Sequence, residues 1–113
     1  MVSPADEDPV DAHDAWVDDM VLAEGLHRYE QMVTVPVTRV ENAWAGLRTF
    51  AADRTPVVGF DPVAPGFFWL AGQGGYGVQT APALAQLTET LCTNDTSPFS
   101  AETVAALSPS RFH

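Results

Sequence analysis

The chain has 113 residues and 46% apolar content, which is the size and composition of one ordinary globular domain. Its formal net charge is −10, and nine of its acidic residues lie within residues 1–30. It has no lysine and only five basic residues, so its charge argues against nonspecific binding to nucleic acid or to anionic membranes. The acidic N-terminal segment is expected to form a solvated face.

The single cysteine and the N-terminal residues indicate a compartment. Cys92 stands alone, so the chain has neither a disulfide framework nor a CxxC zinc pattern, and Cys92 is expected to be a small buried hydrophobic residue. The N-terminus lacks the basic and apolar regions of a signal peptide. No apolar run approaches the ~18 residues that a transmembrane helix needs. We therefore expect a cytoplasmic protein with no transmembrane segment.

The first predicted element is a helix over about 14–33. Prolines break any helix within residues 1–14, and Asp14 is in a suitable position to cap the predicted helix. Apolar residues then recur at helical spacing on one face: Leu22, Leu26, Tyr29 and Val33.

Three strands and two turns are predicted next. A β-branched run begins a strand region over about 35–50, and a turn at 52–55 leads to a strand at 56–60, so these two strands should form a hairpin. A second turn follows, rich in proline and glycine. The run at 67–71 is aromatic and apolar, which is typical of a buried strand.

The C-terminal half is predicted to be mainly helical. A glycine turn at 72–77 leads into a helix over 78–91. After a polar loop, a short helix is expected over 100–107 with Ser100 as its N-cap. The remaining residues form a tail, in which Arg111 has no assigned partner.

The glycine turn between strand and helix is the most informative motif. Residues 72–77 match G-x-G-x-x-G, but a dinucleotide-binding unit also needs a second strand ending in an acid about 20 residues later. Asp95 has roughly that spacing, yet its neighbours are polar and predict no strand. Two interpretations stay open: a structural turn, or a helix N-terminus whose free N–H groups face an anionic ligand.

Several side chains have the chemistry of a binding site. Arg48 follows the apolar residues of WAGL and is either a structural ion-pair partner or a clamp for a carboxylate, which its planar guanidinium suits. Gln79 lies in the first helical turn and can face the same pocket as the glycine turn, and Tyr76 is either a pocket wall or a core aromatic. The histidines show no metal-ligand spacing, so no metal site is predicted.

Two longer stretches carry a family resemblance. WAGLRTFAADRTPVVGFDP and GFFWLAGQGGYGVQTAPAL resemble the C-terminal part of FAD-dependent amino-acid oxidoreductases of the D-amino-acid oxidase superfamily. Within that superfamily they resemble the branch of glycine oxidase and D-arginine dehydrogenase, and the motif GQGGYGVQT is most similar to the D-arginine dehydrogenase-like members. The resemblance implies an α+β or α/β fold, in which mixed substrate-domain strands and a strand, glycine turn and helix complete an FAD-binding domain.

The resemblance also implies residue roles. Arg48 would bind the carboxylate of a small amino-acid substrate, and Gly75 and Gln79 would line the substrate pocket. The flavin-facing residues would be Gln73, Gly74, Gly75, Tyr76, Gly77 and Val78. The family's reaction is oxidative deamination, in which hydride passes from the substrate α-carbon to flavin N5. It needs no side chain as a strong base if the substrate amine binds in its neutral form, so no catalytic residue is assigned.

The sequence departs from the family by lacking the N-terminal dinucleotide-binding unit. We therefore expect an incomplete fold: a C-terminal fragment with residues 1–50 from the substrate-binding domain and 51–113 completing the FAD-binding domain. Alone it should bind FAD weakly or not at all. The missing portion of the FAD domain would be its partner, and a separate chain could supply that portion. The alternative is a small acidic, non-catalytic interaction module, or one part of a split oxidase that needs a partner chain.

Overall fold

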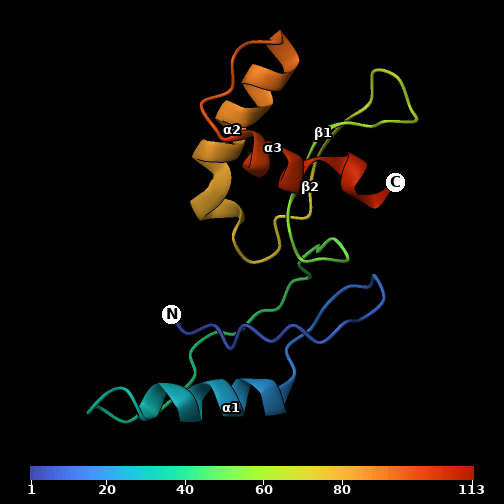
Figure 1. The fold of residues 1–113 in the computed structure, drawn as a ribbon. Helices are drawn as coiled ribbons and strands as arrows, with labels where there is room; N and C mark the ends of the chain where they lie inside the picture. The colour runs from blue at the N-terminus through green and yellow to red at the C-terminus, as the bar shows by residue number, and fades with distance from the viewer. The chain divides into compact units, whose positions relative to one another are not determined.

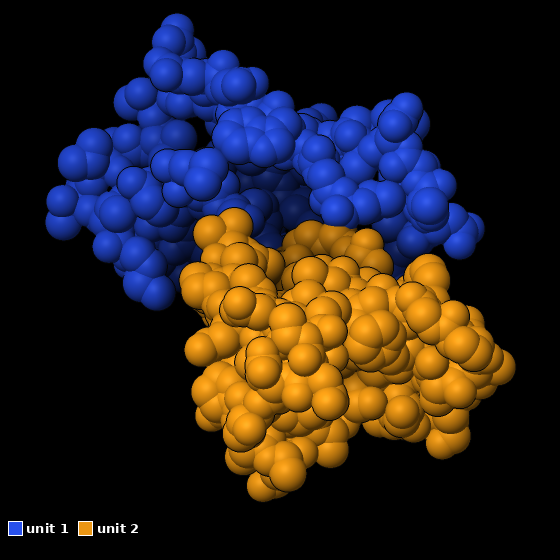
Figure 2. Space-filling model, turned by 90° about the horizontal axis from the view of Figure 1, so that it is seen from above, with its two compact units in different colours: residues 1–47 blue, residues 48–113 orange.

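The computed structural model describes all of residues 1–113 and contains two compact units, residues 1–47 and residues 48–113 (Figure 1 and Figure 2). It has three α-helices, one 3-10 helix and one two-stranded antiparallel sheet. None of the helices combines the length and apolar character needed to cross a membrane. The chain thus has a small mixed fold of helices and strands. The assignment of residues 1–50 and 51–113 to two functional domains stays a prediction.

The first unit contains one helix, α1 (Asp19–Glu30). The Asp18 carboxylate caps it by accepting hydrogen bonds from the backbone N–H groups of Met20 (2.8 Å) and Val21 (3.0 Å). The predicted helix over 14–33 with Asp14 as its cap was therefore too long at both ends. Several acids precede the helix, and Asp18 is the one whose carboxylate reaches the free N–H groups of the first turn.

No regular strand forms within residues 35–49, so the strand region predicted over 35–50 is wrong. Its only ladder contact is an isolated bridge between Phe50 and Gln73. The backbone N–H of Val37 instead donates to the Glu30 carboxylate (2.8 Å). The β-branched residues favour extended backbone, but a strand also needs a neighbouring strand to bond with, and none lies beside this segment.

The second unit is built on strands β1 (Val57–Phe60) and β2 (Phe68–Ala71), which pair antiparallel with Val58 opposite Leu70. The hairpin therefore joins the second and third predicted strands, and the predicted hairpin with 35–50 is wrong. Asp61 stabilises the connecting turn, because its carboxylate accepts from the backbone N–H groups of Val63 (2.8 Å) and Ala64 (2.7 Å).

The predicted helices of the C-terminal half are confirmed as α2 (Gly77–Thr93) and α3 (Ala101–Leu107). Ser100 caps α3 as predicted, since its hydroxyl accepts from the backbone N–H of Thr103 (3.2 Å). The chain then forms a 3-10 helix, η1 (Pro109–Phe112), where the sequence predicted only a tail.

The core of the second unit lies between β1 and the helices α2 and α3 (Figure 1). Val58, Leu84 and Leu87 are buried, and Val58 and Leu87 are each only 1% exposed. Five half-buried apolar residues pack around them: Phe68, Leu91, Phe99, Val104 and Leu107. On the opposite face of β1, Pro109 of η1 packs at Gly59.

Two predictions about burial are wrong. The strand expected to be buried at 67–71 leaves Trp69 38% exposed and Leu70 47% exposed, because β2 is an edge strand of a sheet with only two strands. Cys92, expected to be a buried hydrophobic residue, is exposed near the C-terminal end of α2, on a helix that buries Leu84 and Leu87 instead.

Candidate functional site

The glycine turn connects β2 to α2 and ends at an uncapped helix N-terminus. The backbone N–H of Tyr76 donates to the Gln73 carbonyl (3.0 Å), which closes a tight turn over residues 73–76. Tyr76 is the N-cap residue of α2, and its side chain makes no capping hydrogen bond. The first N–H groups of α2 therefore meet no side-chain acceptor from the cap, as an anion-facing helix start requires.

Residues 49 and 50 pair with this turn. Phe50 forms an antiparallel bridge with Gln73, and the backbone N–H of Gly74 donates to the Thr49 carbonyl (3.0 Å). Gly74 has a left-handed backbone (φ +54°), and a β-carbon added there would overlap the Phe50 ring. Only glycine satisfies both constraints, so Gly74 is what allows Phe50 to lie flush against the turn.

The same pairing brings Arg48 to Gly75. A β-carbon placed on Gly75 would lie 3.0 Å from Nη1 of Arg48 and 3.8 Å from its Cδ. Arg48 and the glycine turn, which the sequence predicted to belong to one site, thus converge on one part of the second unit. Gly75 is itself exposed, and the Arg48 guanidinium lies where a side chain at position 75 would project.

Two further residues belong to this cluster and were not singled out from the sequence. The guanidinium carbons of Arg48 and Arg54 each lie 5.6 Å from the centroid of the Phe50 ring, within the range of a cation–π interaction. Phe50 follows Arg48 by two residues, a spacing that places side chains on one side of an extended backbone. That spacing was the available signal for Phe50. Arg54 sits in a turn, and no sequence pattern marks its approach.

The remaining predicted site residues lie along the start of α2. Tyr76 and Val78 are exposed, and so is Gln79 in the first turn of the helix. Gln73 and Gly77 are half-buried. The predicted flavin-facing and substrate-facing residues therefore form one continuous surface segment, adjacent in the chain to Gly75. Their roles toward a ligand stay predictions.

The turn that follows Phe50 is held by Arg111 of η1. Nε and Nη2 of Arg111 donate to the two Asp53 carboxylate oxygens (2.7 and 3.1 Å), and Nη2 also donates to the Thr55 carbonyl (2.7 Å). The hydrogen bonds from Arg111, partly opposed by desolvation, lower the pKa of Asp53 from 3.8 to about 2. The prediction for residues 52–55 as a turn is confirmed, and its partner is the arginine that the sequence left unassigned.

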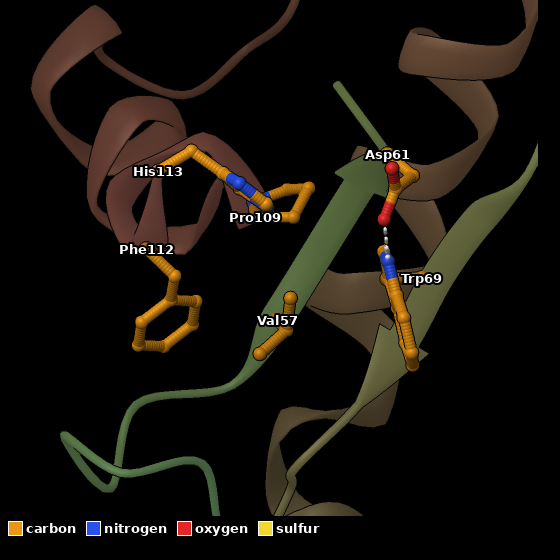
Figure 3. Close-up of a pocket in the computed structure, with 6 residues that line it drawn as sticks. All are labelled: Val57, Asp61, Trp69, Pro109, Phe112 and His113. Carbon is orange, nitrogen blue, oxygen red and sulfur yellow. Dashed lines mark hydrogen bonds between the residues drawn. The ribbon is translucent and has the colours of Figure 1, made fainter. Parts of the chain in front are cut away.

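A shallow depression of about 230 Å³ lies elsewhere on the second unit (Figure 3). It is lined by residues of the sheet and η1: Val57, Asp61, Trp69, Pro109, Phe112 and His113. The Trp69 indole N–H donates to Asp61 (2.8 Å), and this bond, with the backbone N–H groups of Ala64 and Val63, lowers the pKa of Asp61. Asp61 thus stabilises its turn, and none of the predicted site residues lines the depression.

Comparison with known protein families identifies the family of the chain. A family described as DAO, FAD dependent oxidoreductase, matches residues 2–91. The match covers most of the chain and includes Arg48, the glycine turn and nearly all of α2. The chain therefore belongs to the DAO family of FAD-dependent oxidoreductases, and the family implies FAD as cofactor.

The chemistry of the residues around Gly75 is compatible with one edge of a flavin. The surface carries a glycine against which a guanidinium lies, and a helix N-terminus without a side-chain cap. The guanidinium and the helix N-terminus each favour a partly anionic group over an apolar or cationic one. Gln73 to Val78 would hold the flavin edge there, and Arg48 would stand next to it.

Proposed function

We propose that this chain supplies the carboxylate clamp and a flavin-facing turn of an FAD-dependent amino-acid oxidoreductase of the glycine oxidase and D-arginine dehydrogenase-like branch. The observation that carries the proposal is the approach of the Arg48 guanidinium to Gly75. It puts a group suited to carboxylates beside backbone suited to an anionic ring edge. The wording of GQGGYGVQT supports the choice of branch.

Each part of the segment has its own task in this proposal. Arg48 binds the substrate carboxylate through paired hydrogen bonds, which fixes the substrate relative to the turn. Gly75 lets the Arg48 guanidinium lie against the turn, and Gln79 contacts the substrate from the first turn of α2. The N–H groups at the start of α2 stabilise negative charge on the cofactor edge. FAD, when bound, supplies the hydride acceptor for oxidation of the substrate α-carbon.

We further propose that the chain alone binds FAD weakly and is inactive until additional protein completes the site. Support comes from burial: three apolar residues form the buried core, while Phe60, Phe67, Trp69 and Leu70 around the sheet stay well exposed. A family member must bury the ADP half of FAD as well as the flavin ring. The protein segment that does so would act as partner, in the same polypeptide or as a separate chain.

The carboxylate clamp is tested by titrating the full chain with acetate and following backbone amide signals by NMR. Acetate should shift the signals of Gly75 and Gln79, and Arg48→Met should weaken this response by about tenfold or more, since it removes a charge-assisted hydrogen-bonding group. The matched control is Arg39→Met, because Arg39 is an exposed arginine paired with Glu41 (2.8 Å).

Two results would contradict the proposal. One is an acetate response at Gly75 that survives Arg48→Met unchanged. The other concerns the isolated chain: if it held FAD tightly and an added amino acid bleached the flavin absorbance, the chain would need no further protein. A folded monomer that shows no acetate response at Gly75 would favour the acidic interaction module instead, since weak FAD binding is expected in either case.

A further inference from the structure

Arg111 of η1 holds the turn at 52–55 through several hydrogen bonds. Arg111 makes four hydrogen bonds: two to the Asp53 carboxylate, one to the Thr55 carbonyl and one to the Ser108 carbonyl (3.0 Å) within its own segment. The Arg111 side chain is 15% exposed and that of Asp53 is 41% exposed, so the guanidinium is largely buried while the carboxylate stays open to water. A planar guanidinium used in this way fixes the position and the orientation of its acceptors.

The turn is pinned at both of its ends. The Asp53 carboxylate accepts from the Thr55 backbone N–H (3.1 Å), and the Arg54 backbone N–H donates to the Ala51 carbonyl (2.9 Å). Arg111 therefore binds a turn that its own hydrogen bonds already hold closed. The residue at which that turn begins, Ala51, directly follows the segment that pairs with the glycine turn.

From these contacts we propose that Asp53 and Arg111 form a positioning pair, which holds the segment carrying Arg48 and Phe50 in register with the glycine turn. The order of contacts is continuous in the structure. Arg111 fixes the turn, the turn fixes Thr49 and Phe50, and the Thr49 carbonyl accepts the Gly74 N–H (3.0 Å) beside Gly75. The relevance of this register to ligand binding rests on the proposed function. The effect of the pair on the register does not depend on that function.

A purely structural role for Arg111 makes a different prediction. If the arginine only attached η1 to the sheet, its loss would loosen η1 and leave the glycine turn intact. If it only added to overall stability, its loss would affect every protected amide alike. A positioning role predicts a selective effect at Gly74 and Arg54, whose N–H groups depend on the register of residues 49–51.

Amide hydrogen exchange on the full chain separates these roles. In Arg111→Met, the Gly74 and Arg54 amides should exchange about tenfold faster or more than in the wild type. The Thr80 amide, bonded to Tyr76 (3.0 Å), and the Val104 amide, bonded to Ser100 (3.0 Å), should change by less than about twofold. The control is Arg28→Met, which removes an arginine from an exposed pair with Glu24 (2.6 Å).

A second variant guards against simple misfolding. Asp53→Asn keeps the shape of the side chain and removes its charge, so it should accelerate the same two amides. In the double variant Asp53→Asn with Arg111→Met, the Gly74 and Arg54 amides should exchange no faster than in Arg111→Met alone, because both substitutions break the same contact. Arg111→Lys keeps the charge but not the planar fork, and should restore only part of the protection.

The outcomes also distinguish this proposal from the proposed function. Acceleration confined to the His113 amide and its η1 neighbours, or equal at all protected amides, would overturn the positioning role. If the selective effect at Gly74 appears while acetate gives no response at Gly75, positioning stands and the carboxylate clamp fails. If both hold, Arg111→Met should weaken the acetate response several-fold although Arg48 is still present.

Discussion

Residues 1–47 and residues 48–113 hold their structure by different means. In the first unit, α1 depends on local interactions, namely the Asp18 cap and the exposed Glu24–Arg28 pair, and its buried residue is Gly25. The second unit buries Val58, Leu84 and Leu87 and joins distant parts of the chain through Asp53 and Arg111. The helix of the first unit is stabilised by contacts within a few residues, and the second unit by a packed core and a contact between residues far apart in the sequence.

This difference explains why the candidate site lies where it does. Holding Arg48 against Gly75 requires two chain segments to keep a fixed register, and cross-strand bonds and a packed core can do that. Local helix caps fix only the element that carries them. The backbone contacts that hold the site lie within residues 48–113, so the site should respond to changes in that unit.

The largest difference between the units should appear in their apolar residues. Leu87→Ala removes a side chain that is 1% exposed and leaves a cavity, so it should lower the free energy of unfolding by about 2–5 kcal/mol. Met20→Ala alters a side chain that is 78% exposed, so it should change the free energy of unfolding by less than about 0.5 kcal/mol. Urea unfolding measures both, and equal effects would contradict the comparison.

A second difference should appear between two glycines. Gly74→Ala forces a β-carbon into a left-handed position against the Phe50 ring and should cost about 1–3 kcal/mol. A β-carbon added at Gly46 would meet no atom within 4 Å, and Gly46→Ala should stay within about 0.5 kcal/mol. Thermal unfolding provides the comparison, and a harmless Gly74→Ala would show that Phe50 does not lie against the turn.

The start of α1 offers a smaller effect within the first unit. Asp18→Ala removes the carboxylate that accepts two backbone N–H groups and should cost about 1 kcal/mol of helix stability. Asp14→Ala should have little effect, because Asp14 lies outside the helix. Circular dichroism at 222 nm reports helix content. If Asp14→Ala lowered the helix content instead, the helix would begin at Asp14, as the sequence predicted.

The smallest expected effect is a change in the acid limb of the stability curve. The folded pKa of Asp53, about 2, lies below its ordinary value of 3.8, so its contribution is present above about pH 4 and is lost as the pH falls toward 2. Solvent screening reduces this contribution, since Asp53 is exposed. Asp53→Asn and Arg111→Met should both flatten that limb in thermal unfolding scans, and an unchanged slope in either would contradict the pairing.

Sequence patterns predicted what local residues determine. The periodicity of α2, the Ser100 cap of α3 and the turn at 52–55 could all be predicted because short-range bonds fix them. The pairing of β1 with β2 could not be separated from the alternative with 35–50, since both have suitable residues and only tertiary contacts choose between them.

The candidate site shows the same limit. Arg48 and the glycine turn were marked by their residue types, and the structure brings them together through the bond between Thr49 and Gly74. Asp53 and Arg111 are 58 residues apart, and no spacing rule connects an acid in a turn with an arginine near the C-terminus. Exposure of Trp69 and Leu70 was also missed, because an aromatic strand looks the same in sequence whether or not neighbours cover it.

The convergence of Arg48 with the glycine turn can be measured directly in solution by nuclear Overhauser effects on the full chain. The structure predicts one contact between the Gly75 α-protons and the Arg48 δ-protons, since a β-carbon on Gly75 would lie 3.8 Å from Arg48 Cδ, and a second between Gly74 and the Phe50 ring. Observing both would support a shared site. If neither appears and Arg48 contacts other residues, the guanidinium and the turn are separate, and the proposed carboxylate clamp is wrong.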